Sequence, residues 1–336
     1  MDAVSAPSVR PAGSVDHLVR LARTDMDGVD ALILARMQSP VSVIPLLAEH
    51  IIAAGGKRLR PLLTVGAARL AGGVGDAAQK LAAAVEFIHT ATLLHDDVVD
   101  SSQLRRGKVA AHLIWGAPSS VLVGDFLFAR AFELMVETGS HRALEILARA
   151  SRVIAEGEVL QLTRAHDLRL GQAIYLEIIG AKTAELFAAA AEAGAVCARA
   201  DAGRSDALRA YGQSLGLAFQ LADDALDYAG SAETLGKNAG DDFREGKATL
   251  PLILAIQRSG PREAEFWERA IGRKEQTEAD FRRARELVLG TGALDATLDL
   301  AADHADAAKA ALQVFPAGEW REALEALADF AVSRRA

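Results

Sequence analysis

Apolar residues recur three and four positions apart through nearly every segment between the glycines of this 336-residue chain. Because an α-helix has 3.6 residues per turn, this spacing collects them on one helix face. Alanine and leucine, two strong helix formers, dominate the sequence, and the alternating β-branched runs that are typical of strands are scarce. The sequence therefore predicts an all-α protein.

Glycines and prolines divide the chain into helical segments, several of them longer than a usual globular helix. No fixed-period repeat, low-complexity tract or Ser/Pro linker separates two domains. We therefore expect a flexible N-terminal arm over residues 1–14 and one helical domain over residues 15–336. Residues 261–285 are more charged than the sequence before them, and we interpret them as a solvated helical hairpin within that domain.

Composition and charge argue against several classes of protein. Hydrophobic residues make up 51% of the chain, which is enough for a large core without disulfides. The single cysteine, Cys197, lies in an alanine-rich stretch and is interpreted as a small buried apolar residue. The net charge of −8 argues against binding to nucleic acid. Charged residues interrupt every long apolar run, so we expect a soluble, cytoplasmic protein.

Two long predicted helices each end in the pattern D-D-x-x-D. The first cluster is Asp96, Asp97 and Asp100, and the second is Asp223, Asp224 and Asp227. Like charges one helical turn apart repel by roughly 0.2–0.5 kcal/mol, and a helix C-terminus disfavours anions. A solvated acidic face would explain one such cluster, but the flanking sequences TATLLHDDVV and AFQLADDALDY are apolar. Magnesium ions that bridge a diphosphate between the two helices would neutralise this charge.

Basic residues gather at glycine-marked loops, where the backbone can approach a phosphate closely. These loops contain Lys57, Arg58 and Arg60, then Arg105, Arg106 and Lys108, and finally Lys237 and Lys247. Arginine offers a two-pronged donor to phosphate oxygens and lysine a mobile point charge. A substrate that carries diphosphate groups would need such a set.

Together these motifs resemble the trans-isoprenyl diphosphate synthase, or polyprenyl synthetase, family over residues 40–251. The resemblance implies a bundle of long antiparallel helices around a central cavity, and it implies a homodimer. It also implies that isopentenyl diphosphate adds head to tail to an allylic diphosphate. Magnesium would draw the diphosphate off the allylic substrate, and the double bond of isopentenyl diphosphate would attack the resulting carbocation.

The resemblance also implies roles for individual residues. Magnesium would bind Asp96, Asp100 and Asp223, with Asp97, Asp224 and Asp227 nearby. The isopentenyl diphosphate group would bind Lys57, Arg60, His89 and Arg106. The allylic diphosphate would bind Arg105, Lys182, Thr183, Gln220, Lys237 and Lys247, of which Lys182 and Lys237 would also assist catalysis. Glu158 and Gln161 would line the site without an assigned step, and His95 is interpreted as a packing or capping residue.

Product length is predicted from the helix register before Asp96. Ala91 and Thr92 lie one turn earlier and are small, whereas short-chain members of the resembled family commonly carry an aromatic residue there. The growing tail would then pass towards Ile88 and Phe87. We therefore expect an octaprenyl or decaprenyl product, typical of the ubiquinone side chain, with transient membrane contact at product release.

Four other interpretations remain open at this level. The adjacent pair His95 and Asp96 could belong to a helical metal-dependent phosphohydrolase, and a terpene cyclase would also consume a prenyl diphosphate. A shorter-chain synthase would use the same motifs. A noncatalytic subunit of a heteromeric synthase is disfavoured because both aspartate clusters are complete.

Overall fold

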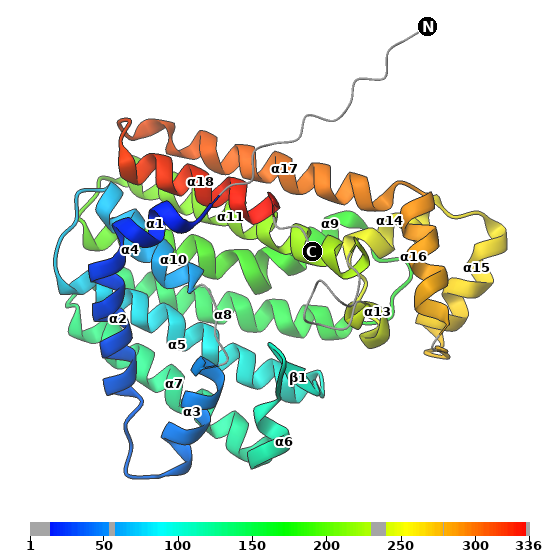
Figure 1. Cartoon of the computed structure of the whole chain (residues 1–336), viewed down its shortest axis with the longest axis horizontal. Helices are drawn as coiled ribbons and strands as arrows, with labels where there is room; N and C mark the ends of the chain where they lie inside the picture. Colours follow the sequence, from blue (N-terminus) through cyan, green and yellow to red (C-terminus); the bar gives the residue numbers. More distant parts are fainter. Residues whose placement is uncertain (1–13, 54–57, 230–239, 278, 334–336) are drawn as a thin grey trace, which may run out of the picture.

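The chain folds into a bundle of long helices, as predicted, and its structure is a computed structural model (Figure 1). The structure describes residues 14–53, 58–229, 240–277 and 279–333. The N-terminal elements are α1 (Asp16–Leu21), α2 (Arg23–Arg36), α3 (Val43–Ala53), α4 (Leu59–Leu70), α5 (Asp76–Val99), β1 (Leu104–Arg105), β2 (Lys108–Val109), α6 (Ala111–Trp115), α7 (Ala117–Glu137) and α8 (His141–Thr163).

The second half of the chain is helical throughout the part that the structure describes. Its elements are α9 (Gln172–Ile179), η1 (Gly180–Ala184), α10 (Glu185–Cys197), α11 (Ala202–Ala229), α13 (Asp241–Glu245), α14 (Leu250–Arg258), α15 (Pro261–Trp267), η2 (Glu268–Gly272), α16 (Asp280–Gly290), α17 (Ala293–Ala311), η3 (Leu312–Val314) and α18 (Glu319–Ser333). The small antiparallel hairpin of β1 and β2 departs from a purely helical fold. Arg106 and Gly107 form its two-residue turn, and both have a positive φ.

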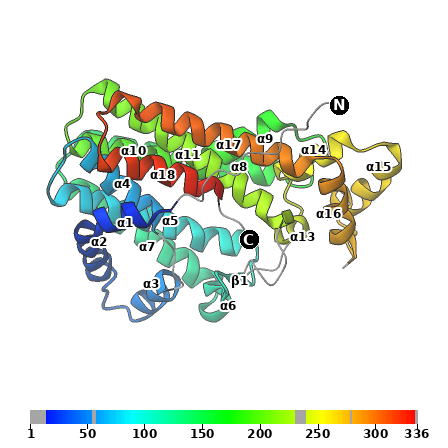
Figure 2. The same cartoon turned by 45° about the horizontal axis from the view of Figure 1, so that its top comes forward.

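Helix α10 is the centre of the bundle. It packs against α4, α5, α8 and α11, and α11 in turn packs against α17 (Figures 1 and 2). Residues 185–195 of α10 are all buried, including Glu185 and Glu192. The two glutamates accept hydrogen bonds or ion pairs from arginines of α8 and α11, which satisfies their charge inside the bundle.

Glycine allows α11 to lie unusually close to α10. A Cβ atom on Gly212 would stand 2.4 Å from the carbonyl oxygen of Phe187, and one on Gly216 would stand 2.5 Å from the Cα of Ala184. Both neighbours are backbone atoms, which cannot turn aside as a flexible side chain can. The close contact brings the helix of the second aspartate cluster against the centre of the bundle.

A π-helical turn, η1, separates α9 from α10. Such turns are rare and often lie at functional sites, because the wider turn changes the direction in which side chains point. Here the turn carries Lys182 and Thr183, two residues that the resemblance assigns to substrate binding. Sequence periodicity gives no indication of this irregularity.

Helices α15 and α16, with η2, form the hairpin expected for residues 261–285, at the right-hand end of Figure 1. It is less solvated than predicted, because Trp267, Ile271, Ala284 and Val288 are buried in a core that also includes Tyr228 of α11. The limits of the predicted domain remain a prediction, and residues 1–13 of the expected arm lie outside the described residues.

The structure also bears on two smaller expectations, one about Cys197 and one about helices that could span a membrane. The Cys197 side chain is partly buried near the carbonyl oxygen of Gly194, and burial raises the pKa of its thiol to about 11. A thiol of this kind is a poor nucleophile at neutral pH. Within the described residues, none of the helices combines the length and hydrophobicity needed to cross a bilayer.

We expect Gly212→Ala to destabilise the fold, because its new methyl group would overlap the backbone of α10. Overpacking of this kind costs about 1–3 kcal/mol. Gly203→Ala is the matched control, since Gly203 is exposed near the start of the same helix. Urea unfolding would measure both variants, and an unchanged midpoint for Gly212→Ala would contradict the close contact.

Candidate active site

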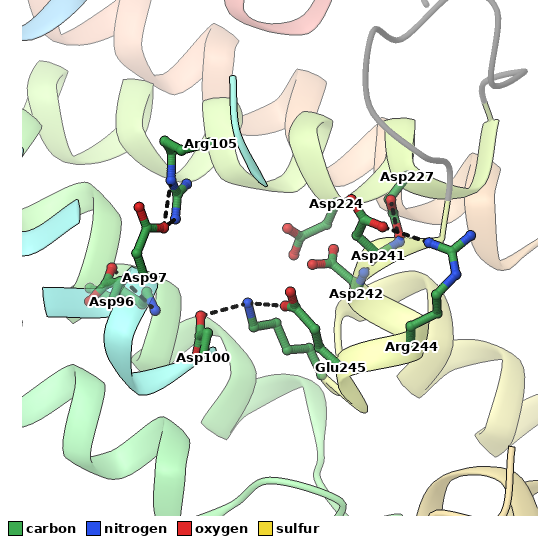
Figure 3. A network of polar contacts seen from close by, with 12 residues as sticks. Asp96, Asp97, Asp100, Arg105, Asp224, Asp227, Asp241, Asp242, Arg244 and Glu245 are labelled. Atoms are coloured by element: carbon green, nitrogen blue, oxygen red, sulfur yellow. Dashed lines mark hydrogen bonds and ion pairs between the residues drawn. The ribbon is translucent and has the colours of Figure 1, made fainter. Parts of the chain in front are cut away.

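The two aspartate clusters face each other across the space between α5 and α11 (Figure 3). Asp96 and Asp97 lie in the last turn of α5 and Asp100 follows it directly, whereas the second cluster lies in the last two turns of α11. A cavity of about 370 Å³ lies between them. Its lining includes Asp100, Asp224, Asp242, Lys182, Thr183, Gln220 and Lys247.

In the first cluster, Asp97 differs from its two neighbours. Its side chain is fully buried and accepts a hydrogen bond from Nε of Arg105 at 2.8 Å. Asp97 therefore holds the hairpin of β1 and β2 against α5. Asp96 and Asp100 instead lie near lysines: Oδ2 of Asp96 is 3.9 Å from Nζ of Lys182, and Oδ2 of Asp100 is 3.0 Å from Nζ of Lys247.

In the second cluster, Asp224 and Asp227 accept hydrogen bonds from other parts of the chain. The Tyr175 hydroxyl donates to Oδ2 of Asp224 at 2.5 Å, and Nε2 of Gln220 donates to its Oδ1 at 2.6 Å. Asp227 accepts hydrogen bonds from the backbone N–H groups of Gly240 and Asp241, at 2.9 and 3.2 Å. Asp227 thus caps the start of α13.

Lysines provide positive charge between the clusters. Nζ of Lys182 donates to Oε2 of Glu158 at 2.7 Å, which explains the position of Glu158 on α8. Nζ of Lys247 contacts both Asp100 and Glu245 (Figure 3). Burial alone would lower the pKa of Lys247, but the surrounding carboxylates raise it above its usual range. Lys247 therefore remains charged at the wall of the cavity.

The aspartates near the cavity are destabilised in their charged form. Burial, together with the charges of Glu158 and Asp100, raises the pKa of Asp96 to about 7, although Lys182 opposes this. Burial also raises the pKa of Asp224 to about 7 despite its two hydrogen bonds. Asp242, from α13, is buried beside the second cluster, and its pKa is raised well above the usual value. Additional positive charge would stabilise all three carboxylates.

A second group of basic residues is centred on Arg60 and His89. Nη1 of Arg60 lies 3.1 Å from Nε2 of His89, so the imidazole accepts and stays neutral. Burial lowers the pKa of His89 well below its usual value, and nearby arginines lower it further. Burial also lowers the pKa of Arg60 to about 10. Glu86, buried beside them, offsets part of this positive charge.

The structure brings together most of the predicted site residues. Arg60, His89 and Arg106 form the second basic group, while Lys182, Thr183, Gln220 and Lys247 lie at the cavity. Lys57 and Lys237 lie outside the described residues. Gln161 also lines the cavity. Nε2 of His95 lies 3.0 Å from the carbonyl oxygen of Val121, the packing position that the sequence suggested.

Four acidic or polar residues escape sequence reasoning. Tyr175 and Glu86 lie in apolar helices and carry no recognisable signal, whereas Asp242 and Glu245 stand in the acidic-basic stretch GDDFREGK, which could have revealed them.

The residues predicted to set product length are not confirmed by the structure. Phe87, Ile88 and Ala91 are fully buried in the main core, Thr92 is half-buried, and the cavity lining does not include them. The tunnel therefore stays a prediction.

Residues 41–288 match the family profile described as polyprenyl synthetase. The chain belongs to the polyprenyl synthetase family. The octaprenyl diphosphate synthase of Escherichia coli K12 is 46% identical over 325 residues, which cover 96% of this chain and 99% of that protein. The octaprenyl diphosphate synthase of Haemophilus influenzae is 42% identical over 321 residues, covering 96% and 97%.

Solved structures of polyprenyl synthetases share the fold. A polyprenyl synthase from Caulobacter crescentus CB15, complexed with calcium and isoprenyl diphosphate, superposes with a TM-score of 0.95 and 81% identity over 98% of this chain and 100% of that chain. A decaprenyl diphosphate synthase from Rhodobacter capsulatus has a TM-score of 0.90 and 50% identity, with coverage of 95% and 98%. The predicted family, its all-α fold and the class of prenyl-transferring enzyme are confirmed.

We expect Asp96→Asn to stabilise the ligand-free protein at alkaline pH. The folded-state pKa of about 7 lies above the ordinary value of 3.8, so Asp96 destabilises the fold increasingly as the pH rises between these values. Asparagine removes the charge. The melting temperature should therefore rise at about pH 8 and change little at about pH 4. Asp206→Asn, at an exposed site on α11, should change neither. A lower melting temperature for Asp96→Asn at about pH 8 would contradict the burial of this charge.

Proposed function

We propose that this polyprenyl synthetase is an all-trans long-chain polyprenyl diphosphate synthase with an octaprenyl or decaprenyl product. The observation that carries the proposal is the pair of aspartate clusters that face each other (Figure 3). Lys182 and Lys247 pair with the first cluster and line the adjacent cavity. The names of similar proteins support the product length, since octaprenyl diphosphate synthases are 46% and 42% identical and cover nearly the whole chain. The allylic starter would be a short prenyl diphosphate such as farnesyl diphosphate.

The carboxylates fit divalent metal ions. Asp100 lines the cavity at the end of α5, Asp96 lies one turn before it, and Asp223 belongs to the facing helix. Within the described residues, no three possible ligands are close enough together to hold a metal ion by themselves, so the ion would be shared between these carboxylates and the diphosphate. The raised pKa values of Asp96 and Asp224 show that the protein alone compensates this negative charge poorly. The similar polyprenyl synthase from Caulobacter crescentus was solved in complex with calcium, which is also a hard divalent ion. We infer that Mg²⁺ binds Asp96, Asp100 and Asp223, where it would neutralise the leaving diphosphate.

The chain's own residues would then perform the rest of the reaction. Arg60, Arg106 and His89 would hold the diphosphate of isopentenyl diphosphate, with Arg60 donating its two-pronged guanidinium. Lys182 and Lys247, together with Thr183 and Gln220 at the same cavity, would hold the allylic diphosphate and stabilise it as it leaves. The apolar wall formed by Leu162, Leu170, Ile178 and Ile179 would exclude water from the carbocation.

The alternative functions explain less of the structure. A phosphohydrolase centred on His95 and Asp96 is disfavoured because the imidazole turns to Val121 and Asp125 of α7 rather than to the other aspartates. A noncatalytic subunit of a heteromeric synthase would not require lysines such as Lys182 and Lys247 beside the aspartates. A shorter product remains the second candidate, since the described cavity does not reach Ala91 or Thr92.

We also propose a homodimer. Exposed apolar residues gather on α6 and α7, where Leu113, Ile114, Leu122, Phe132 and Val136 are each between 41% and 66% exposed. Burial of this face against a second copy would remove a large apolar area from water.

The cytoplasmic location, the role in ubiquinone biosynthesis and the transient membrane contact stay predictions from the sequence.

We expect the purified protein, given Mg²⁺, labelled isopentenyl diphosphate and farnesyl diphosphate, to make prenyl diphosphates of eight to ten isoprene units. Chelation of the metal with EDTA should abolish elongation, and Asp223→Asn should lower its rate by about a hundredfold or more. Asp206→Asn on the exposed surface of the same helix is the control. Release of diphosphate from farnesyl diphosphate alone, without elongation, would instead indicate a hydrolase or cyclase.

We expect Ala91→Phe to shorten the product while elongation continues, because the ring would obstruct a tail that runs along α5. Ala91 is fully buried, so an aromatic ring there could also disturb packing. Thr92→Phe, at a half-buried site one residue further, tests the same path with more room. Chromatography of the dephosphorylated products would show the lengths. If both variants fold and make the same product as the wild type, the tail does not pass this part of α5.

A further inference from the structure

The hairpin of α15, η2 and α16 contacts the end of α11, the helix that carries the second aspartate cluster. Arg285 of α16 donates from Nε to the carbonyl oxygen of Tyr228 at 2.8 Å and from Nη2 to that of Ala229 at 3.2 Å. These two carbonyls belong to the last turn of α11, where a helix has no intrahelical partners for its carbonyl groups. Arg285 therefore caps the helix that carries Asp223, Asp224 and Asp227.

A cation at this position has a second effect. The last turn of a helix carries partial negative charge, and here three aspartates add to it. The guanidinium of Arg285 opposes both, because it bonds directly to the helix end. Aspartates placed near a helix C-terminus would otherwise weaken that end of α11, so the cap offsets a destabilisation that the cluster itself creates.

Two further contacts join the hairpin to the rim of the cavity. Nε2 of Gln276 donates to the carbonyl oxygen of Phe243 in α13 at 2.8 Å. His166, which lines the cavity, donates from Nδ1 to the carbonyl oxygen of Ile271 at 3.2 Å. Its ring lies against Gly246, where a Cβ atom would stand 2.2 Å from Cε1, and Gly246 directly precedes Lys247.

Apolar packing and an ion pair make the hairpin a firm support. The Phe281 ring lies 6.1 Å from that of Tyr228 and 6.0 Å from that of Phe243, measured between ring centroids, so it contacts α11 and α13 together. Within the hairpin, Arg269 makes two hydrogen bonds to the Asp280 carboxylate, at 2.7 and 2.9 Å. A two-pronged bond of this kind fixes η2 against the start of α16.

We propose that this hairpin is a positioning element for the second aspartate cluster, and that Arg285 is its principal positioning residue. By capping α11, Arg285 holds the aspartates in the orientation that binds the metal-bound allylic diphosphate. The proposed place of the isopentenyl diphosphate group is at Arg60 and His89, and no contact of the hairpin among those described reaches these residues. The proposal rests on the proposed function for the identity of the ligand, but the cap itself can be tested without it.

The first test needs no substrate. Hydrogen exchange followed by mass spectrometry, on the metal-free full-length protein, would report the backbone protection of the last turns of α11. Arg285→Ala should raise exchange there by about tenfold, because exposed helix ends open most readily. Arg283→Ala is the matched control, since Arg283 lies on the exposed side of the same helix and pairs only weakly with Glu286 and Glu263. Equal exchange in Arg285→Ala and the wild type would overturn the cap.

The second test measures binding. Calorimetry with farnesyl diphosphate and Mg²⁺, in the absence of isopentenyl diphosphate, should show about tenfold weaker binding for Arg285→Ala, as is typical when a residue that orients metal ligands is lost. Arg285→Lys, which can still donate to one carbonyl, should recover part of the affinity. Binding of isopentenyl diphosphate alone should not change. Equal losses for both substrates would show a general loss of structure and overturn the proposal.

The two tests separate the possible failures. If the wild type does not bind farnesyl diphosphate at all, the proposed function fails while the exchange result still decides whether Arg285 caps α11. If the wild type elongates prenyl chains and Arg285→Ala binds farnesyl diphosphate as tightly as the wild type does, the positioning role is wrong and the proposed function stands.

Discussion

The candidate active site depends on negative charge, and the fold concentrates that charge at positions where an ionised carboxylate is unfavourable. Two sets of aspartates stand at helix C-termini, partly or fully removed from water, and burial raises the pKa of Asp96 and Asp224 to about 7. A protein that had only to fold would gain nothing from this arrangement. Lys182 and Lys247 reduce the destabilisation by pairing with Asp96 and Asp100, and divalent ions would reduce it further. Under the proposed function, binding of metal and diphosphate would be favoured because it would relieve this repulsion.

The six motif aspartates do not share one task. Asp97 holds the hairpin with Arg105, Asp224 is fixed by Tyr175 and Gln220, and Asp227 caps α13. These three side chains accept hydrogen bonds from the protein itself. In the first cluster, Asp96 and Asp100 have lysines as partners instead, and lysines can turn to a phosphate. The D-D-x-x-D pattern of the first cluster therefore combines the proposed metal ligands, Asp96 and Asp100, with a structural residue, Asp97, within a single helical turn.

The rest of the bundle explains why the two clusters can meet. Gly212 and Gly216 let α11 approach α10 closely, and the π-helical turn before α10 sends Lys182 and Thr183 towards the cavity. The hairpin of α15, η2 and α16 then caps the end of α11 through Arg285. The sequence motifs do not indicate any of these structural features. Each feature nevertheless helps to fix the position of a motif residue.

The all-α fold, the two acidic clusters and most of the basic residues can be predicted from the sequence, because helical periodicity and one-turn spacing are local properties. The hairpin at residues 261–285 is recognisable as a hairpin, but its buried Trp267 and its cap on α11 are not, since both depend on a partner far along the chain. Tyr175 escapes prediction for the same reason: it lies 49 positions from Asp224 and acts only after α9 and α11 have packed together.

The sequence by itself determined the all-α fold, the family and the helices that carry the two aspartate clusters. Only the tertiary structure decided how the aspartates differ. It determined which of them accept hydrogen bonds from the protein, which lysine pairs with which carboxylate, and how far each pKa shifts. The physical reason is that hydrogen bonds and burial act over a few ångströms in space. Spacing along a helix places side chains on a face, but only packing between helices decides what that face meets.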